Sequence, residues 1–140
     1  MRERILGLLG LMRRAGAIVM GEDNSLEAVR AGKGKILILA SDVSDNARRR
    51  AENVSAGRSV EMVELPCSRE ELGGALGLNV CSVAVVTDLG FAEALAKLLA
   101  KEDPEKYADM ASRVRDRREK AVRRKAQKGS KRVGTRRTNV

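Results

Sequence analysis

The sequence KILILA, residues 35–40, is an almost unbroken apolar run with the length of one strand. A strand that is apolar at every position must be covered on both faces, because its side chains point alternately to opposite sides of the sheet. A second such run, SVAVVT, occupies residues 82–87. Two buried strands predict a sheet that lies between two layers of helices.

Helical and strand patterns alternate on both sides of these runs. Two helix starts are marked by Ser44 and by the capping-box spacing from Ser68 to Glu71. The element order predicts an α/β fold: a three-layer α/β/α sandwich with a central mixed four-stranded sheet, formed by residues 1–102 as one domain. The predicted helices are 2–15, 22–31, 44–56, 68–77 and 90–101, and the predicted strands are 17–20, 35–40, 59–65 and 82–87.

A further helix is predicted to begin at Asp103-Pro104, because a capping residue followed by proline at the first helical position is a common helix start. Residues 103–124 form this basic helix. We expect its first turns to dock on the domain through an apolar stripe of Tyr107, Met110, Ala111 and Val114. Residues 125–140 form a basic tail with almost nothing to bury, which predicts disorder in the absence of a partner.

The net charge of +9 belongs entirely to the C-terminal part. Residues 1–102 contain 14 basic and 14 acidic side chains, whereas residues 103–140 contain 14 basic and 5 acidic ones. This asymmetry predicts a polyanionic partner. Nucleic acid fits better than a membrane surface, because no Trp-, Phe- or Leu-rich face accompanies the charge. The alternative is a tail or linker that only adds solubility.

The residue types needed for common catalytic and metal sites are missing. The sequence has no histidine and two cysteines, Cys67 and Cys81, so we expect no zinc site, no disulfide framework and no cofactor. Phosphate-loop and GxSxG motifs are absent, which predicts a non-catalytic protein. Two reduced thiols, no signal peptide and no long apolar run lead us to expect a cytoplasmic protein.

The sequence GEDNS, residues 21–25, lies where a strand is predicted to turn into a helix. In one interpretation, Glu22 and Asp23 only complement the partial positive charge of the helix N-terminus. In the other, Asp23 and Asn24 are held at a rigid corner, where their oxygens accept hydrogen bonds from guanine amino and imino groups. Spacing alone leaves both interpretations open.

Two other segments are candidates for ligand contacts. In the loop GLNV, residues 77–80, Leu78 and Val80 flank Asn79, and they either anchor the loop in the core or form an apolar lip over an extruded nucleotide. Three cations, Arg30, Lys33 and Lys35, gather around the end of the second predicted helix. They form either a solvated face or a set of phosphate contacts, which position a protein on nucleic acid without determining sequence.

Residues 21–42, GEDNSLEAVRAGKGKILILASD, resemble the first motif of the kink-turn RNA-binding ribosomal protein superfamily of the L7Ae/L30e type. That motif is a glycine, a polar pair, a helix, GxxK, an apolar strand and AxD. Residues 71–80, ELGGALGLNV, resemble the second motif, LGxxxG, and residues 87–92, TDLGFA, are similar to the bacterial YlxQ-like branch. The resemblance covers residues 1–100 in order.

The resemblance implies a non-enzymatic RNA-binding protein that holds a kink-turn, a bent helix–bulge–helix with sheared G·A pairs. Gly21 matches the corner glycine, and Asp23-Asn24 matches the polar pair that meets the guanines. Leu78 and Val80 match the loop that covers the extruded nucleotide. The family pair is usually Asn-Glu, and the helix position of Glu27 usually carries lysine, so here Arg30 would be the nearest compensating cation.

The main hypothesis is therefore a monomeric, ribosome-associated or structured-RNA-binding protein, with a tail that adds phosphate contacts. Its candidate RNA-binding residues are Gly21, Glu22, Asp23, Asn24, Glu27, Arg30, Lys33, Lys35, Leu78, Asn79 and Val80. The alternative, motivated by Glu27, is a protein-interaction module on the same fold that has lost specific RNA recognition. A small nucleotide-binding enzyme would suit the α/β topology, but no motif supports it.

Overall fold

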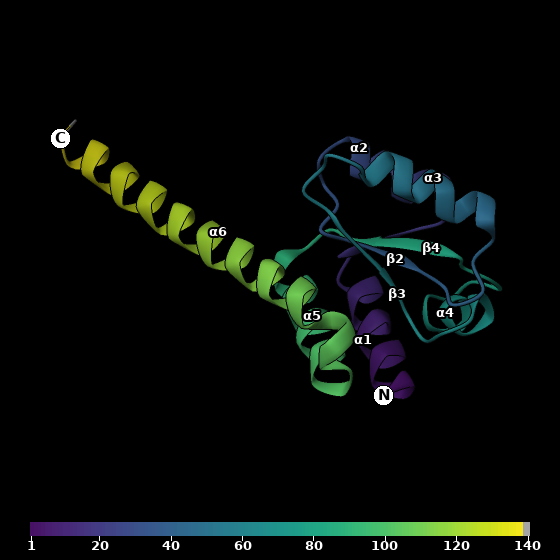
Figure 1. Ribbon diagram of the computed structural model, residues 1–140. Coiled ribbons are helices and arrows are strands. Elements are labelled where there is room, and N and C mark those ends of the chain that lie inside the picture. Colours follow the sequence, from purple (N-terminus) through teal and green to yellow (C-terminus); the bar gives the residue numbers. More distant parts are fainter. Residues whose placement is uncertain (139–140) are drawn as a thin grey trace.

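The computed structural model describes residues 1–138, with side chains described through residue 127. Its elements alternate as the sequence predicts, with most ends within one or two residues of the expected positions (Figure 1). In chain order they are α1 (Arg2–Arg14), β1 (Ile18–Met20), α2 (Glu22–Arg30), β2 (Ile36–Leu39), α3 (Asp45–Ser55), β3 (Glu61–Glu64), α4 (Arg69–Ala75), β4 (Val83–Val86), α5 (Leu89–Glu102) and α6 (Pro104–Thr138).

The four strands form one mixed sheet in the order β1-β4-β2-β3. β4 is antiparallel to both β1 and β2, while β2 and β3 are parallel. Met20, the last residue of β1, is therefore paired with Ala84 near the start of β4, and Leu39, the last residue of β2, is paired with Val83. The topology brings the segments that follow β1 and β2 to the same end of the sheet as the segment that precedes β4.

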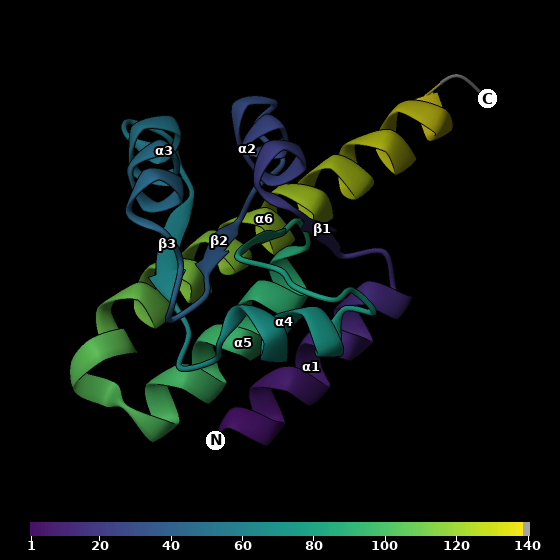
Figure 2. The ribbon, with the colours of Figure 1, turned by 90° about the vertical axis from the view of Figure 1, so that its right-hand side faces the viewer.

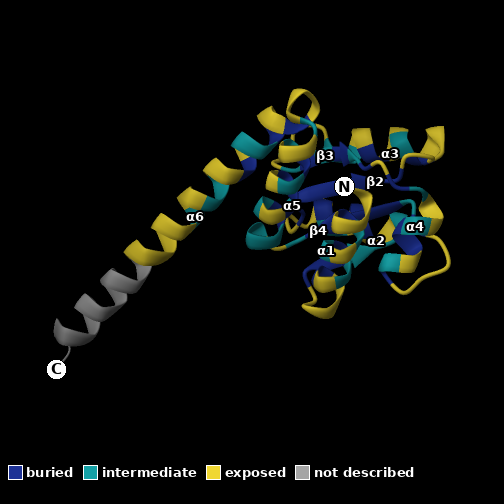
Figure 3. Cartoon of the chain, turned by 90° about the horizontal axis from the view of Figure 1, so that it is seen from below, coloured by how far each residue is buried: buried dark blue, intermediate teal, exposed yellow. Residues whose placement is uncertain are grey.

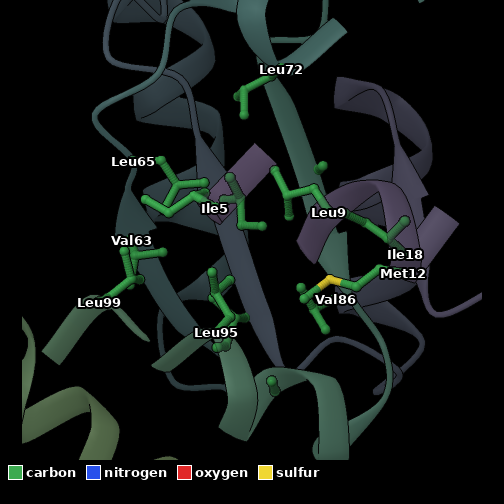
Figure 4. Close-up of a cluster of buried hydrophobic side chains, with 14 of the residues drawn as sticks. Ile5, Leu9, Met12, Ile18, Val63, Leu65, Leu72, Val86, Leu95 and Leu99 are labelled. Atoms are coloured by element: carbon green, nitrogen blue, oxygen red, sulfur yellow. The ribbon is translucent and has the colours of Figure 1, made fainter. Parts of the chain in front are cut away.

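Helices cover both faces of the sheet, which confirms the predicted three-layer sandwich (Figure 2). α2 and α3 cover one face, and α1, α4, α5 and the start of α6 cover the other. β2 supplies both cores, because its alternating residues face opposite layers: Ile36 and Ile38 pack with α1 and α5, and Leu37 and Leu39 pack with α2 and α3. Figure 4 shows the larger core, which includes Ile5, Leu9, Met12, Leu72, Leu95 and Leu99.

Side-chain caps fix the predicted helix starts. The Ser44 hydroxyl accepts a hydrogen bond from the Ala47 N–H at 3.2 Å. Ser68 and Glu71 form a complete capping box, with N–H to oxygen distances of 3.0 and 3.1 Å. The Ser68 N–H, and then the Arg2 guanidinium, lower the pKa of the Glu71 carboxyl. These local bonds explain why the sequence pattern located α3 and α4 correctly.

The C-terminal helix agrees with the prediction in its first turns and differs from it in its length. Its first turns belong to the domain core, since Tyr107, Met110 and Val114 are buried, as the apolar stripe predicted. The helix then continues to Thr138, through residues 125–138 for which the sequence predicted disorder. Lys, Arg, Ala and Gln have high helix propensity, so a polar, basic segment can extend a helix that is already nucleated by docking. Residues 139 and 140 of the predicted tail lie outside the described residues.

Candidate nucleic-acid interface

The turn from β1 into α2, residues 21–24, is called the corner here. Gly21 has φ +94° and ψ 150°, a conformation that residues with a side chain rarely adopt. Its N–H donates to the Val83 carbonyl at 2.9 Å, and the buried Ser25 hydroxyl donates to the Val19 carbonyl at 3.2 Å. The corner is therefore fixed to the first residue of β4, with the Ser25 side chain buried beneath it.

The polar side chains of the corner face outward. Asp23 and Asn24 are exposed, and the Asp23 carboxylate lies 3.1 Å from the guanidinium of Arg50 on α3. Arg50 also pairs with Glu22, and these contacts, first the hydrogen bond to Asp23, raise the pKa of Arg50. Much of the negative charge at the corner is thus balanced by one cation from the neighbouring helix, while the Asn24 amide is exposed to solvent.

The loop between α4 and β4, residues 77–80, is called the apolar loop here. Leu78 and Val80 are 41% and 57% exposed, so they do not anchor the loop in the core; the preceding Leu76, fully buried, does. Gly73 in α4 allows the loop to approach closely, because a Cβ at Gly73 would lie 2.8 Å from backbone atoms of Asn79 and Val80. The loop therefore presents two apolar side chains to solvent from a closely packed backbone.

The corner and the apolar loop lie at the same end of the sheet. The apolar loop ends three residues before Val83, whose carbonyl accepts the Gly21 N–H. The side chain of Cys81 is buried between the two segments, and its thiol donates to the Val83 carbonyl at 3.3 Å. The two segments that the sequence singled out separately are therefore neighbours in the fold, with polar groups on one and apolar groups on the other.

Two cations next to these segments were missed by the sequence analysis. One is Arg50, described above. The other is Arg13 of α1, whose guanidinium lies 2.7 Å from the position that a Cβ on Gly77 would occupy. The available signals were the runs of adjacent arginines at 13–14 and 48–50, but only the fold shows which member of each run faces the candidate interface.

Arg30, Lys33 and Lys35 lie away from the corner, at the other end of the sheet. The Lys35 N–H donates to the Val86 carbonyl at 2.8 Å, at the end of β4 opposite to Val83. α2 separates Asn24 from Lys33 by nine residues, about 13 Å at the helical rise. The Arg30 guanidinium lies 3.5 Å from the Glu27 carboxylate, so Arg30 balances Glu27 within the helix. The candidate residues thus form two separate surfaces.

Residues 3–96 match the model of the Ribosomal protein L7Ae/L30e/S12e/Gadd45 family. The chain belongs to this family. It is 35% identical over 92 residues to the RNA-binding protein YlxQ of Bacillus subtilis, covering 66% of this chain and 91% of that protein. It is 31% identical to the large ribosomal subunit protein eL30 of Dictyostelium discoideum, over 71% of this chain and 90% of that protein.

A solved structure has the same fold. It is a protein of unknown function from Bacillus halodurans, similar to this chain with a TM-score of 0.63 and 31% identity, over 67% of this chain and 94% of that one. The family match ends within α5, so α6 lies outside it. Membership in this ribosomal-protein family confirms the resemblance found in the sequence and the prediction of a protein that is not an enzyme.

The family's fold leaves little reactive chemistry in the described part of the chain. Burial raises the pKa of the Cys67 thiol to about 11, and burial also raises the pKa of Cys81, so neither thiol is activated at neutral pH. Among the described residues, no cluster of histidine, cysteine or carboxylate side chains is arranged to hold a metal ion. The described helices include none that is long and apolar enough to span a membrane.

Proposed function

We propose that this protein is a non-catalytic RNA-binding protein, associated with the ribosome or another structured RNA, that recognises a kink-turn-like bend through the corner and the apolar loop. The observation that supports the proposal best is their adjacency: exposed Asp23 and Asn24 lie at the same end of the sheet as exposed Leu78 and Val80. The Bacillus subtilis relative is an RNA-binding protein, which agrees with the proposal.

The two segments would perform different tasks. The oxygens of Asp23 and Asn24 can accept hydrogen bonds from guanine N–H groups, and the Asn24 amide can also donate. Leu78 and Val80 offer an apolar surface on which the face of an unstacked base can pack, as in the recognition of unpaired RNA nucleotides. Arg13 places positive charge beside the apolar loop, where phosphates of a bent backbone would approach, and Arg50 reduces the repulsion between the corner carboxylates and those phosphates.

The alternative, a protein-interaction module, uses the same exposed features differently. The Glu27 side chain is 76% exposed on α2, and a carboxylate there would repel a phosphate unless Arg30 balanced it. Because the Arg30 guanidinium lies 3.5 Å from the Glu27 carboxylate and balances its charge, we propose RNA as the partner of the corner and the apolar loop. All the contributing elements come from one chain, and we propose that it acts as a monomer in the cytoplasm.

The test compares two RNAs for binding to the full chain, since α6 contributes to the core. One RNA contains a kink-turn; the other has the same strands with the bulge closed and the G·A pairs replaced by Watson–Crick pairs. We expect tighter binding to the kink-turn RNA. Asn24→Ala should weaken that binding about 10-fold, the cost of about one hydrogen bond with a buried partner, while leaving duplex binding unchanged.

Matched controls are available on exposed surfaces elsewhere. Asn53→Ala on α3 is the control for Asn24→Ala. The test variant of the apolar loop is Val80→Ser. Its control is Val122→Ser on α6, because Val122 is 58% and Val80 57% exposed. Only the variants at the corner and the apolar loop should lower the preference for the kink-turn. Equal affinity of the unmodified protein for both RNAs would refute kink-turn recognition, and binding to neither RNA would favour the protein-interaction alternative.

A further inference from the structure

A basic groove runs between the body of the domain and α6, at the sheet end opposite to the corner. Two adjoining clefts, of about 470 and 280 Å³, share Lys35 and Ser59 in their linings. Leu89 and Ala121 line the larger cleft, and Val29 and Val60 line the smaller one. The cations that line the two clefts, called the α6 groove here, are Lys35, Arg58, Arg117, Lys120 and Arg124.

The α6 wall of the groove is held rigidly to the sheet. The Glu61 side chain on β3, only 11% exposed, pairs with Arg113 at 2.9 Å and with Arg117 at 3.2 Å. The Arg117 guanidinium also donates to the Ser59 carbonyl at 2.9 Å. On the adjacent face, Arg118 pairs with Glu93 of α5 at 2.9 Å. The cations farther along α6 are therefore presented from a fixed helix.

Of the five groove cations, Arg117 is paired with Glu61, and the other four give the groove its positive charge. No carboxylate lines either cleft. Among the side chains that the structure describes, Lys35, Arg58, Lys120 and Arg124 form no salt bridge within 4.0 Å. Several carboxylates on the elements that form the groove have other partners: Glu61 and Glu93 pair with arginines, Asp116 lies 3.8 Å from Arg115, and Asp88 accepts from the Phe91 N–H at 2.9 Å. The exposed Glu119 on α6 lies outside the lining.

The chemistry of the groove fits a phosphodiester backbone. Its charged groups are lysines and arginines that can donate to phosphate oxygens, and no aromatic side chain lines it for stacking bases. Beyond the docked turns, α6 projects away from the body, as Figures 1 and 3 show, and exposed cations such as Arg123 and Lys125 continue along it. An open, extended surface whose charged groups are all cations suits a long anionic strand better than a compact ligand.

We propose that the α6 groove is a second RNA-binding site, which holds the backbone of an RNA segment other than the one at the corner. The two sites lie at opposite ends of the sheet, about 10 Å apart along β4 by strand rise alone. One chain would thus bridge two RNA segments. This inference rests on the proposed function, because it takes RNA as the ligand of the corner.

The test uses two triple variants of the full chain with equal net charge. The groove variant carries Lys35→Gln, Lys120→Gln and Arg124→Gln. The control variant carries Arg4→Gln, Lys101→Gln and Lys106→Gln, which removes the same residue types on surfaces that line neither cleft. Both lower the net charge from +9 to +6. Thermal unfolding should show that both variants remain folded.

Binding to a plain RNA duplex, measured over a range of salt concentrations, reports on the groove. We expect the groove variant to bind about 10- to 100-fold more weakly than the control variant at 0.15 M salt. The slope of log affinity against log salt concentration should be smaller by about 2 to 3, because a protein that has lost three phosphate contacts releases fewer counterions on binding. The preference for a kink-turn RNA should stay the same in both variants. Equal duplex affinity and slope in the two variants would overturn the second site.

A bridging assay separates this inference from the proposed function. A kink-turn RNA is immobilised with the full chain, and the capture of a labelled plain duplex is measured. The unmodified protein and the control variant should capture the duplex, and the groove variant should not. If the unmodified protein binds the kink-turn RNA but fails to capture the duplex, bridging is refuted. If the unmodified protein captures duplex RNA but shows no preference for the kink-turn, only kink-turn recognition by the corner is refuted. Binding of polyglutamate as tightly as duplex RNA would refute RNA as the ligand.

Discussion

The packing of the apolar loop against α4 makes a sharp prediction at two adjacent glycines. A Cβ added at Gly73 would lie 2.8 Å from the Asn79 carbonyl group and the Val80 Cα, which are backbone atoms that cannot rotate away. At Gly74, one residue on, a Cβ would have no atom within 4 Å. Both residues belong to α4, so Gly73→Ala and Gly74→Ala share one local effect and differ in one contact.

The shared effect is the gain in helix propensity, about 0.5–1 kcal/mol for glycine to alanine. At Gly73, this gain is opposed by an overpacking cost of about 1–3 kcal/mol, because the loop backbone must move. We therefore expect Gly74→Ala to stabilise the protein slightly and Gly73→Ala to destabilise it. The difference in unfolding free energy between the two variants isolates the steric contact, about 1–3 kcal/mol.

The measurement is thermal and urea unfolding of both variants, combined with binding to the kink-turn and duplex RNAs. A difference of this size should separate the two melting temperatures by about 4–12 °C. Gly73→Ala should also weaken kink-turn binding, because it displaces the backbone that carries Val80, and Gly74→Ala should not. If Gly73→Ala melts as high as Gly74→Ala, the close approach of the apolar loop to α4 is wrong.

Two further predictions concern other contacts. Glu61→Gln removes the negative charge that Arg113 and Arg117 share, so it should lower the unfolding free energy by about 1–3 kcal/mol and increase proteolysis within α6. Glu119→Gln, at an exposed glutamate outside the groove, is the control without effect. Cys67 has a folded-state pKa raised to about 11, so its contribution to stability should be present below the ordinary thiol pKa of about 9 and be lost as the pH rises towards 11. Between pH 8 and pH 10.5 this loss should be about 2 kcal/mol in urea unfolding, and Cys67→Ala should abolish it; a Cys67→Ala protein with the pH dependence of the unmodified protein would contradict the prediction.

The fold could be predicted from the sequence because its decisive signals are local. The KILILA run at 35–40 marks a strand buried on both faces, and β2 is indeed buried at all four positions. The caps at Ser44 and Ser68 mark helix starts through bonds within four residues. The docking of Tyr107 could be predicted from the spacing of its stripe, because an amphipathic helix must cover its apolar face.

The candidate site could be predicted only in part, because its composition depends on contacts between distant residues. The corner and the apolar loop carry recognisable motifs, but their adjacency follows from the antiparallel pairing of β1 with β4. Arg50 is 27 residues from Asp23 in sequence, and no local pattern pairs them. Lys33 and Lys35 were predicted as a separate cluster at the end of the second helix, and the sequence did not show that α2 places this cluster at the end of the sheet opposite to the corner.

The C-terminal helix shows a limit of compositional reasoning. Residues 125–138 contain little to bury, which predicted disorder, yet the structure continues α6 through them. Composition describes what a segment would do alone. Here the segment follows a helix that is anchored by Val114, by Arg117 and by Arg118, so the unfavourable nucleation step is already complete before residue 125.

The position of β1 at the edge of the sheet has a consequence for the order of events during synthesis. In the described sheet, its neighbour is β4, which the ribosome makes more than 60 residues later. The Gly21 N–H cannot find its acceptor, the Val83 carbonyl, until that strand has emerged. The corner therefore matures late although it is encoded early, and the groove matures later still, after α6 has docked. A nascent chain would gain its two contact surfaces in that sequence.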